Sequence, residues 1–269
     1  MRVSFTKMHG LGNDFVVLDA RDDALPPLSP AAVRSLAERT TGIGCDQVIV
    51  LEPSGSADFR MRIYNADGGE VEACGNAARA VALLHGSAAQ VETAGGAIRL
   101  TPEGQGASID MGVPRFEWNA IPLAFAMDTL EMPVAWGDLG SPGAVNVGNP
   151  HIVFFVNDIE CVDLQRIGPE IERDSLFPER VNLNIAAVES RDRIRLRVWE
   201  RGAGLTRACG TGACATAVVA MRRGLTDRKV AVALPGGELK IEWGEDDHIV
   251  MKGPATESFR GSFEWNDFA

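Results

Sequence analysis

Cys74 and Cys209 are the residues of this chain best suited to chemistry, because both stand where a helix is predicted to begin. Each is followed by glycine and then by a run rich in alanine and other apolar residues, which predicts a buried helix. The positive end of a helix dipole lowers the pKa of a cysteine, and the unpaired backbone N–H groups of the first turn bind anions. The pattern predicts two thiolate-prone cysteines, each beside a site for a carboxylate.

Two such thiols suit the inversion of a stereocentre that carries a carboxylate. One thiolate removes the α-proton from one face, and the opposite thiol returns a proton to the other face. The roles are exchanged in the reverse direction. A single preorganised donor aimed at a developing oxyanion lowers a barrier by about 2.7–4 kcal/mol. Several helix N-terminal donors would therefore carry much of the stabilisation that an α-carbanion needs.

The two cysteines are 135 residues apart, about half of the 269-residue chain, and other landmarks repeat in the same order. Residues 60–63 resemble residues 195–198, and both segments alternate apolar and charged residues as a half-buried strand does. Gly12 and Asn13 resemble Gly148 and Asn149, and residues 91–100 resemble 232–241. The repeat predicts two related domains, 1–117 and 118–256, each with several strands and one central helix.

The helices are placed by capping and termination signals. The two central helices are predicted from about Gly75 to near Gly86 and from about Gly210 to Gly224, because glycine ends helices. A further helix is predicted after Ser29 and Pro30, and another around residues 164–173. The rest of the chain is predicted to be strand and turn.

Composition excludes several classes of protein. The hydrophobic fraction of 45% and the charged fraction of 23% are typical of a globular chain, and the net charge of −11 argues against nucleic acid as a partner. The sequence has neither an apolar run of 18 residues nor the apolar core of a signal peptide, and its five cysteines argue against a secreted disulfide framework. We predict a soluble, cytoplasmic protein that does not associate with membranes.

The remaining cysteines, Cys45, Cys161 and Cys214, have no counterparts in the repeat and are predicted to be packing residues. The spacing from Cys209 to Cys214 is not that of a zinc or thioredoxin motif. We find no metal-ligand cluster, phosphate loop or pyridoxal-phosphate lysine context in the sequence, so no metal and no cofactor are predicted.

Several motifs resemble those of the diaminopimelate epimerase family, and the resemblance covers nearly the whole chain. The motifs are KMHGLGNDF at residues 7–15, GCDQ at 44–47, YNADGG at 64–69, CGN at 74–76, GNPH at 148–151, VN at 181–182, ERG at 200–202 and CGTG at 209–212. Proline racemases and phenazine-biosynthesis isomerases share the fold of this family, and the first motif favours the diaminopimelate branch.

The resemblance implies an isomerase that interconverts LL- and meso-diaminopimelate in lysine and peptidoglycan biosynthesis without pyridoxal phosphate. It implies an α+β fold of two pseudo-symmetric domains, each a mixed β-sheet or barrel wrapped around a central α-helix, with residues 257–269 returning to the N-terminal domain. It also implies a homodimer, although Phe259 stands where the family has a tyrosine that helps dimerisation.

The resemblance places catalytic roles on Cys74 and Cys209, and the tuning of the thiols on His151 and Glu200. The residues implied to bind substrate are Asn13, Gln47, Asn65, Gly75, Asn76, Asn149, Asn182, Glu200, Arg201, Gly210 and Thr211. Carboxamides supply both donors and acceptors without adding charge, which suits a substrate with zwitterionic ends.

Alternative functions stay open from the residues alone. A related cofactor-independent racemase, of the proline-racemase kind, would use the same cysteine pair. A Cys–His hydrolase would use one cysteine with His151 as base and leaves the other cysteine unexplained. A redox protein with a Cys74–Cys209 disulfide does not explain the polar ligands, and a binding module has no use for two reactive thiols.

Overall fold

The computed structural model describes residues 1–72 and 74–268, and the chain divides into two compact units. Unit 1 is formed by Met1–Ile109 with Gly253–Ala269, and unit 2 by Asp110–Lys252. Two residues lie outside the described residues: Ala73, which directly precedes Cys74, and Ala269, the last residue of the segment 257–269.

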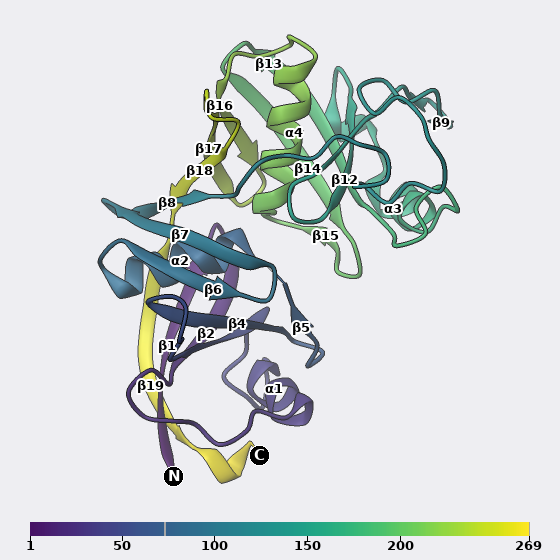
Figure 1. Ribbon diagram of the computed structural model, residues 1–269. Helices are drawn as coiled ribbons and strands as arrows, with labels where there is room; N and C mark the ends of the chain where they lie inside the picture. Colours follow the sequence, from purple (N-terminus) through teal and green to yellow (C-terminus); the bar gives the residue numbers. More distant parts are fainter. Residues whose placement is uncertain (73, 269) are drawn as a thin grey trace. The chain divides into compact units, whose positions relative to one another are not determined.

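Unit 1 is a mixed sheet with a helix packed against it (Figure 1). Its strands are β1 (Arg2–Gly10), β2 (Asn13–Asp19), β3 (Gln47–Glu52), β4 (Phe59–Asn65), β5 (Glu70–Val71), β6 (Ala89–Thr93), β7 (Gly96–Glu103), β8 (Gly106–Asp110) and β19 (Thr256–Glu264). Its helices are α1 (Pro30–Ala37), α2 (Gly75–His85) and the short 3₁₀ helix η2 (Trp265–Asp267).

Unit 2 is built from the same kinds of element. Its strands are β9 (Ala135–Trp136), β10 (Leu139–Gly140), β11 (Gly143–Asn146), β12 (Pro150–Phe155), β13 (Asn182–Ser190), β14 (Arg193–Glu200), β15 (Gly204–Thr206), β16 (Lys229–Leu234), β17 (Gly237–Trp243) and β18 (Ile249–Pro254), which crosses the boundary. Its helices are η1 (Ile159–Cys161), α3 (Leu164–Glu172) and α4 (Gly210–Arg222).

The two units share one order of strand pairings. In unit 1, β1 and β2 are antiparallel, β2 and β3 parallel, β3 and β4 antiparallel, β4 and β6 parallel, and β6 and β7 antiparallel. Strands β11, β12, β13, β14, β16 and β17 of unit 2 repeat this series step by step. Strands β5 and β15 pair with β4 and β14 at the same point, just before the central helix. The landmarks that repeat in the sequence thus fall on equivalent elements.

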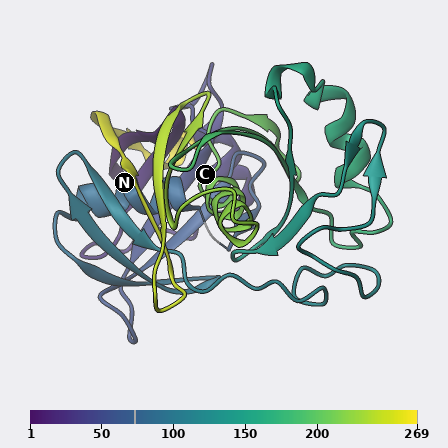
Figure 2. The same cartoon turned by 90° about the horizontal axis from the view of Figure 1, so that it is seen from above.

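The central helix of each unit packs against its sheet. Helix α2 packs against β1, β7 and β19, and α4 against β11 to β14, β16 and β17. Figure 2 looks nearly along α4, with strands of unit 2 curving around it. Eleven of the 13 residues of α4 are buried, as its alanine-rich sequence predicts. The predicted α+β class, with strands around a central helix, is confirmed.

All four predicted helices are present, and α2 ends at the predicted glycine, whereas α4 ends at Arg222, two residues before Gly224. Ser29 caps α1, its side chain accepting a hydrogen bond from the Ala32 N–H at 3.1 Å, and Pro30 takes the first helical position. Helix α2 stops at Gly86, whose φ of 78° lies in the left-handed region that glycine adopts without strain.

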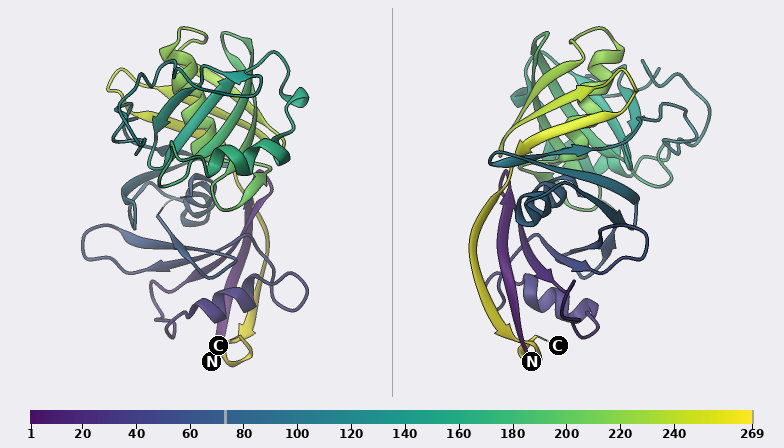
Figure 3. Two further views of the ribbon diagram at one scale, coloured as in Figure 1. Left: turned by 90° about the vertical axis from the view of Figure 1, so that its right-hand side faces the viewer. Right: turned by 60° about the vertical axis from the view of Figure 1, so that its left-hand side comes forward.

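The C-terminal segment completes the sheet of unit 1. Strand β19 pairs antiparallel with β1 along its whole length. Figure 3 shows the two strands side by side, with the two chain termini close together at one end of these strands. The Trp265 N–H donates to the Met1 carbonyl at 2.8 Å. Residues at the two ends of the sequence therefore build one edge of the sheet that carries α2.

Candidate active site

Cys74 is the N-cap of α2, and its surroundings contain two of the predicted ligands. Its sulfur accepts a hydrogen bond from the Ala77 N–H at 3.5 Å, and its thiol lies 3.8 Å from Asn13 Oδ1. Asn76 Nδ2 donates to the same Asn13 oxygen at 3.1 Å. The turn between β1 and β2 thus brings Asn13 to the start of α2, where the helix dipole is positive.

Gln47 and Asn65 form a second group in unit 1. They are cross-strand neighbours on β3 and β4, and Gln47 Nε2 donates to Asn65 Oδ1 at 2.9 Å. The residue before Gln47 connects the two groups, since Asp46 Oδ2 accepts a hydrogen bond from Asn13 Nδ2 at 2.9 Å. All six predicted site residues of unit 1 lie at the ends of β2 to β4 or at the start of α2: Asn13, Gln47, Asn65, Cys74, Gly75 and Asn76.

Cys209 is the N-cap of α4 in the same way. Its sulfur accepts from the Gly212 N–H at 3.3 Å and lies 3.5 Å from Thr211 Oγ1. Glu200, at the end of β14, takes part in a hydrogen bond with the Cys209 thiol, and Thr206 Oγ1 donates to Glu200 Oε1. The short strand β15 thus turns the chain back so that a carboxylate lies beside the sulfur.

The ionisation of Cys209 differs from the expectation for a helix N-terminus. Cys209 is 3% exposed, and burial raises the pKa of its thiol well above the usual range. The negative charge of Glu200 raises the pKa further. The prediction of a thiolate-prone Cys209 is wrong for this structure, because desolvation and a neighbouring carboxylate outweigh the favourable end of the helix.

His151, on β12, is wholly buried between two carboxamides. Its Nε2 lies 2.9 Å from Asn149 Oδ1, and its Nδ1 lies 3.1 Å from Asn184 Nδ2. Because Asn184 Nδ2 can only donate, Nδ1 is the acceptor and Nε2–H donates to Asn149. Burial lowers the pKa of His151 to about 3, so the ring is neutral at physiological pH. The imidazole holds Asn149 with its Nδ2 amino group turned away from the ring.

The low pKa of His151 predicts a pH dependence of stability. In the unfolded state His151 takes up a proton near the ordinary pKa of 6.5, whereas the folded state keeps the ring neutral. The contribution of the neutral, buried ring to the free energy of unfolding is therefore complete above pH 6.5. It is lost as the pH falls toward 3, by about 1.4 kcal/mol per pH unit. Urea unfolding should show about 2 kcal/mol less stability at pH 5 than at pH 7 from this residue. His151→Gln should remove that part of the slope, and an equal slope in both proteins would contradict the assignment.

Asn182 and Arg201 lie at neighbouring strand ends in unit 2. Asn182 Nδ2 donates to the Pro150 carbonyl at 2.8 Å, and Asn182 Oδ1 accepts from the Arg201 backbone N–H at 2.9 Å. The Arg201 guanidinium donates to the Glu179 carbonyl at 2.9 Å. Both the backbone N–H and the guanidinium of Arg201 thus have partners within unit 2.

Two buried residues at the site were not singled out in the sequence. Arg79 is 0% exposed and donates to Asn76 Oδ1 at 2.7 Å, and Asn184 is also 0% exposed. Asn184 could have been found from its spacing, because it stands two residues after Asn182 on a strand and must share its face. Gly212 leaves room for it, since a Cβ there would lie 2.8 Å from Asn184 Oδ1.

The other three cysteines have different environments. Cys45 and Cys214 are buried and pack as predicted, and burial raises the pKa of Cys45 to about 11. The prediction that Cys161 is a packing residue is wrong. Cys161 is exposed at the end of η1, where its thiol lies 3.5 Å from Asp158 Oδ2.

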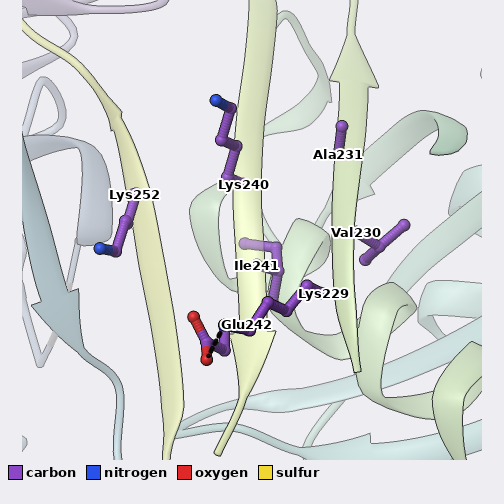
Figure 4. A pocket seen from close by; sticks show the side chains of 7 residues that line it. All are labelled: Lys229, Val230, Ala231, Lys240, Ile241, Glu242 and Lys252. Carbon is purple, nitrogen blue, oxygen red and sulfur yellow. Dashed lines mark ion pairs between the residues drawn. The ribbon is translucent and has the colours of Figure 1, made fainter. Parts of the chain in front are cut away.

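A shallow hollow of about 280 Å³ on β16 to β18 contains none of the predicted site residues (Figure 4). It is lined by Lys229, Val230, Ala231, Lys240, Ile241, Glu242 and Lys252.

Among the residues that the structure describes, no group of three or more histidine, cysteine, aspartate or glutamate side chains is placed to hold a metal ion. Among residues 1–72 and 74–268, no helix is both long and apolar enough to cross a membrane.

Comparison with known proteins decides the family. The model of the diaminopimelate epimerase family matches residues 5–117 and 143–257. The chain belongs to this family. A diaminopimelate epimerase of Erythrobacter litoralis is 71% identical over 269 residues, with all of both chains covered. The diaminopimelate epimerase of Sphingopyxis alaskensis is 59% identical, with 98% of each chain covered. That of Zymomonas mobilis is 54% identical, with all of each chain covered.

Solved structures of more distant proteins share the fold of this diaminopimelate epimerase family member. A phenazine biosynthesis protein of the PhzF family from Bacillus anthracis has a TM-score of 0.70 at 15% identity, over 98% of this chain and 99% of that chain. A hydroxyproline epimerase from Agrobacterium vitis, with bound trans-4-hydroxy-L-proline, has a TM-score of 0.69 at 14% identity, over 97% and 91%. At these identities the likeness shows the fold alone. Family membership makes the chain an isomerase.

Proposed function

We propose that this isomerase interconverts LL- and meso-diaminopimelate by a two-base mechanism in which Cys74 and Cys209 carry the protons. The observation that carries the proposal is the equivalence of the two sulfurs. Each is the N-cap of the central helix of its unit, and each accepts a hydrogen bond from the N–H three residues further along the helix. Two equivalent proton carriers are what a reversible inversion requires.

The proton balance of the reaction is closed by the two sulfurs. One thiolate takes the α-proton and becomes a thiol, while the electron pair of the C–H bond moves into the carboxylate as an enediolate. The other thiol then donates its proton to the opposite face of the α-carbon and becomes the thiolate. We propose that backbone N–H groups at the two helix N-termini stabilise the carboxylate, with Asn13, Asn76 and Thr211 as further ligands.

The contacts of Glu200 support a role in preparing Cys209. A thiol whose pKa is raised needs a base that takes its proton before it can act as one. The Glu200 carboxylate, held by Thr206, is hydrogen-bonded to the Cys209 thiol and is the base that the arrangement offers. We propose that His151 tunes the site indirectly, because its hydrogen bond fixes the side chain of Asn149, a proposed substrate ligand.

A Cys–His hydrolase is the alternative that the surroundings of His151 disfavour. Both ring nitrogens already have carboxamide partners, Asn149 and Asn184, so neither is left to activate a nucleophilic cysteine. The proline-racemase-like alternative has the same fold, and the high identity to diaminopimelate epimerases favours diaminopimelate as the substrate.

The proposed function is tested by incubating the chelator-treated protein with LL-diaminopimelate in D₂O. We expect meso-diaminopimelate that carries deuterium at the inverted α-carbon, formed at a rate that chelation does not change, and no pyridoxal absorbance in the protein. Activity that returns only with added metal or pyridoxal phosphate would contradict the two-thiol mechanism. Ester or amide turnover without inversion would indicate the hydrolase, and turnover of proline alone would indicate the related racemase.

We further propose a cytoplasmic homodimer that acts in lysine and peptidoglycan biosynthesis. The mechanism requires reduced thiols, which the cytoplasm maintains, and all five cysteines are thiols in the structure. For the dimer, β19 offers a mostly exposed face on which Phe259 is 51% exposed and packs edge-on against Phe5 at 5.9 Å. Aromatic side chains are enriched at interfaces between subunits.

A further inference from the structure

A buried carboxamide lies behind His151 in unit 2. Asn184, on β13, is 0% exposed, and its Nδ2 lies 2.9 Å from the Ile152 carbonyl oxygen and 3.1 Å from His151 Nδ1. A longer contact of 3.4 Å joins the same nitrogen to the Asn182 carbonyl. The two strands β12 and β13 pair in parallel, which brings Asn184 beside the histidine. Asn184 is outside the predicted ligand set.

The backbone of β12 fixes the orientation of the Asn184 amide. A carbonyl oxygen can only accept hydrogen bonds, so the amide atom that faces the Ile152 carbonyl is the amino nitrogen. Rotating the amide by 180° would place Oδ1 against that carbonyl, and two acceptors would then oppose each other in a buried place. Because the same amino group faces His151 Nδ1, that ring nitrogen must be the acceptor of the pair.

A neutral imidazole has one N–H, so this contact decides which ring nitrogen carries the hydrogen. Burial, helped by the positive charge of Arg201, lowers the pKa of His151 to about 3, and the ring is neutral. With Nδ1 as the acceptor, the hydrogen lies on Nε2, which donates to Asn149 Oδ1 at 2.9 Å. The Asn149 amide is thereby held with its oxygen on the ring and its amino group away from it.

We infer that Asn184 is a positioning residue for substrate binding, which sets the tautomer of His151 and, through the ring, the orientation of the Asn149 amide. The inference rests on the proposed role of Asn149 as a substrate ligand. The series runs from the Ile152 carbonyl through Asn184 and His151 to Asn149. The direction of every hydrogen bond in it follows from the carbonyl at its backbone end.

The other end of the series is available to a ligand. Asn149 is only partly buried, and within residues 1–72 and 74–268 its amino group has no hydrogen-bond partner. An amino group of this kind can only donate, so the atom that it recognises is an acceptor, such as a carboxylate oxygen. The other tautomer of His151 would place the amino group on the ring and turn the Asn149 oxygen outward instead.

The oxygen of Asn184 shows that packing alone does not account for this residue. Oδ1 is buried and has no hydrogen-bond partner in the part of the chain that the structure describes. A buried acceptor without a donor destabilises a fold, and a hydrocarbon side chain would avoid that penalty. Gly212 leaves room for the oxygen, since a Cβ there would lie 2.8 Å from it. The hydrogen bonds of the amino group are what distinguish asparagine from an apolar residue at this place.

The first test measures the tautomer of His151 by NMR. The chain has four histidines, so long-range ¹H–¹⁵N spectra of protein labelled with ¹⁵N-histidine give few signals, and His151→Gln identifies those of His151. Near neutral pH we expect a protonated Nε2 and an unprotonated Nδ1 in the wild-type protein. A wild-type ring with its hydrogen on Nδ1 would overturn the inference without the need for any variant of Asn184.

Asn184→Asp is expected to reverse the tautomer. An ionised carboxylate can only accept, so the hydrogen should move to Nδ1, and kcat/KM should fall at least tenfold. Thr216→Val is the matched control, because Thr216 is also 0% exposed in unit 2 and also has a buried oxygen without a partner among the described residues. It should change neither the ring signals nor kcat/KM. An unprotonated Nδ1 in Asn184→Asp would show that residue 184 does not set the tautomer.

A double-mutant cycle shows whether Asn184 acts through Asn149. Asn184→Leu keeps the branched shape of the side chain and removes the amino group, and we expect it to lower kcat/KM about tenfold, mainly through KM. Asn149→Ala removes the amide whose orientation is set. In that background Asn184→Leu should therefore change kcat/KM less than twofold. Losses that multiply in the double variant would assign Asn184 a structural role only and contradict the inference.

Failure of the inference can be told apart from failure of the proposed function. If the wild-type protein does not epimerise diaminopimelate, the proposed function fails, and the spectra still test the control of the tautomer. If the wild-type protein is active but the spectra or the cycle go against Asn184, the positioning role fails while the proposed function stands.

Discussion

Replacing either Cys74 or Cys209 with alanine is expected to lower kcat for epimerisation by about 10³-fold or more, because a positioned acid or base contributes on the order of 10²–10⁴. Each variant keeps one proton carrier and loses the one that serves the opposite face. The remaining sulfur can still remove an α-proton and return it to the same face. In D₂O, each variant should therefore incorporate deuterium faster than it inverts the stereocentre, which NMR together with chiral chromatography would measure.

Cys214→Ala provides the control for the effect of a lost sulfur in a packed helix. Cys214 lies on α4, five residues beyond Cys209, and is 0% exposed. Its replacement should lower stability without removing activity, and Cys161→Ala at the surface should change neither. Inversion at the wild-type rate in Cys74→Ala or in Cys209→Ala would rule out the two-base scheme.

Glu200→Gln is expected to lower kcat by about 10²-fold, because glutamine cannot take the proton of the Cys209 thiol. The charge of Glu200 raises the pKa of Cys209, so its removal should lower that pKa. The limb of the pH–rate profile that reports Cys209 should then move to lower pH. Both effects are measured in one series of kcat values across pH, compared with the wild-type protein.

Glu189→Gln is the matched control for the loss of a carboxylate in unit 2. Glu189 is a surface residue that pairs with Arg193 and Arg195. Its replacement should leave both the rate and the pH profile unchanged. A Glu200→Gln variant with a wild-type profile would show that the carboxylate does not act on the sulfur.

Much of the architecture follows from local signals in the sequence. The alternating segments at 60–63 and 195–198 lie in β4 and β14, and the alanine-rich runs after the two cysteines form α2 and α4. Ser29 and Gly86 mark helix ends as predicted. These features depend on backbone geometry and on burial of one face, which are properties of short segments.

The chemistry of the side chains was decided by tertiary packing. The helix-start signal predicts a lower pKa at Cys209, but the folded chain buries the sulfur beside Glu200 and raises it. The exposure of Cys161 and the complete burial of Arg79 likewise depend on which elements cover them. Solvation and charge at a site are sums over neighbours far apart in the chain, so no local pattern contains them.

The sequence by itself determined the duplicated plan, the central helices and the two cysteines that begin them, because the repeat is written in residue types at matching positions. Only the tertiary structure decided how Asn149 is turned. That orientation needs the buried His151 on β12 and the buried Asn184 on β13, joined in one series of hydrogen bonds. Hydrogen-bond direction depends on the partner in space, and those partners are brought together only when the two strands pair.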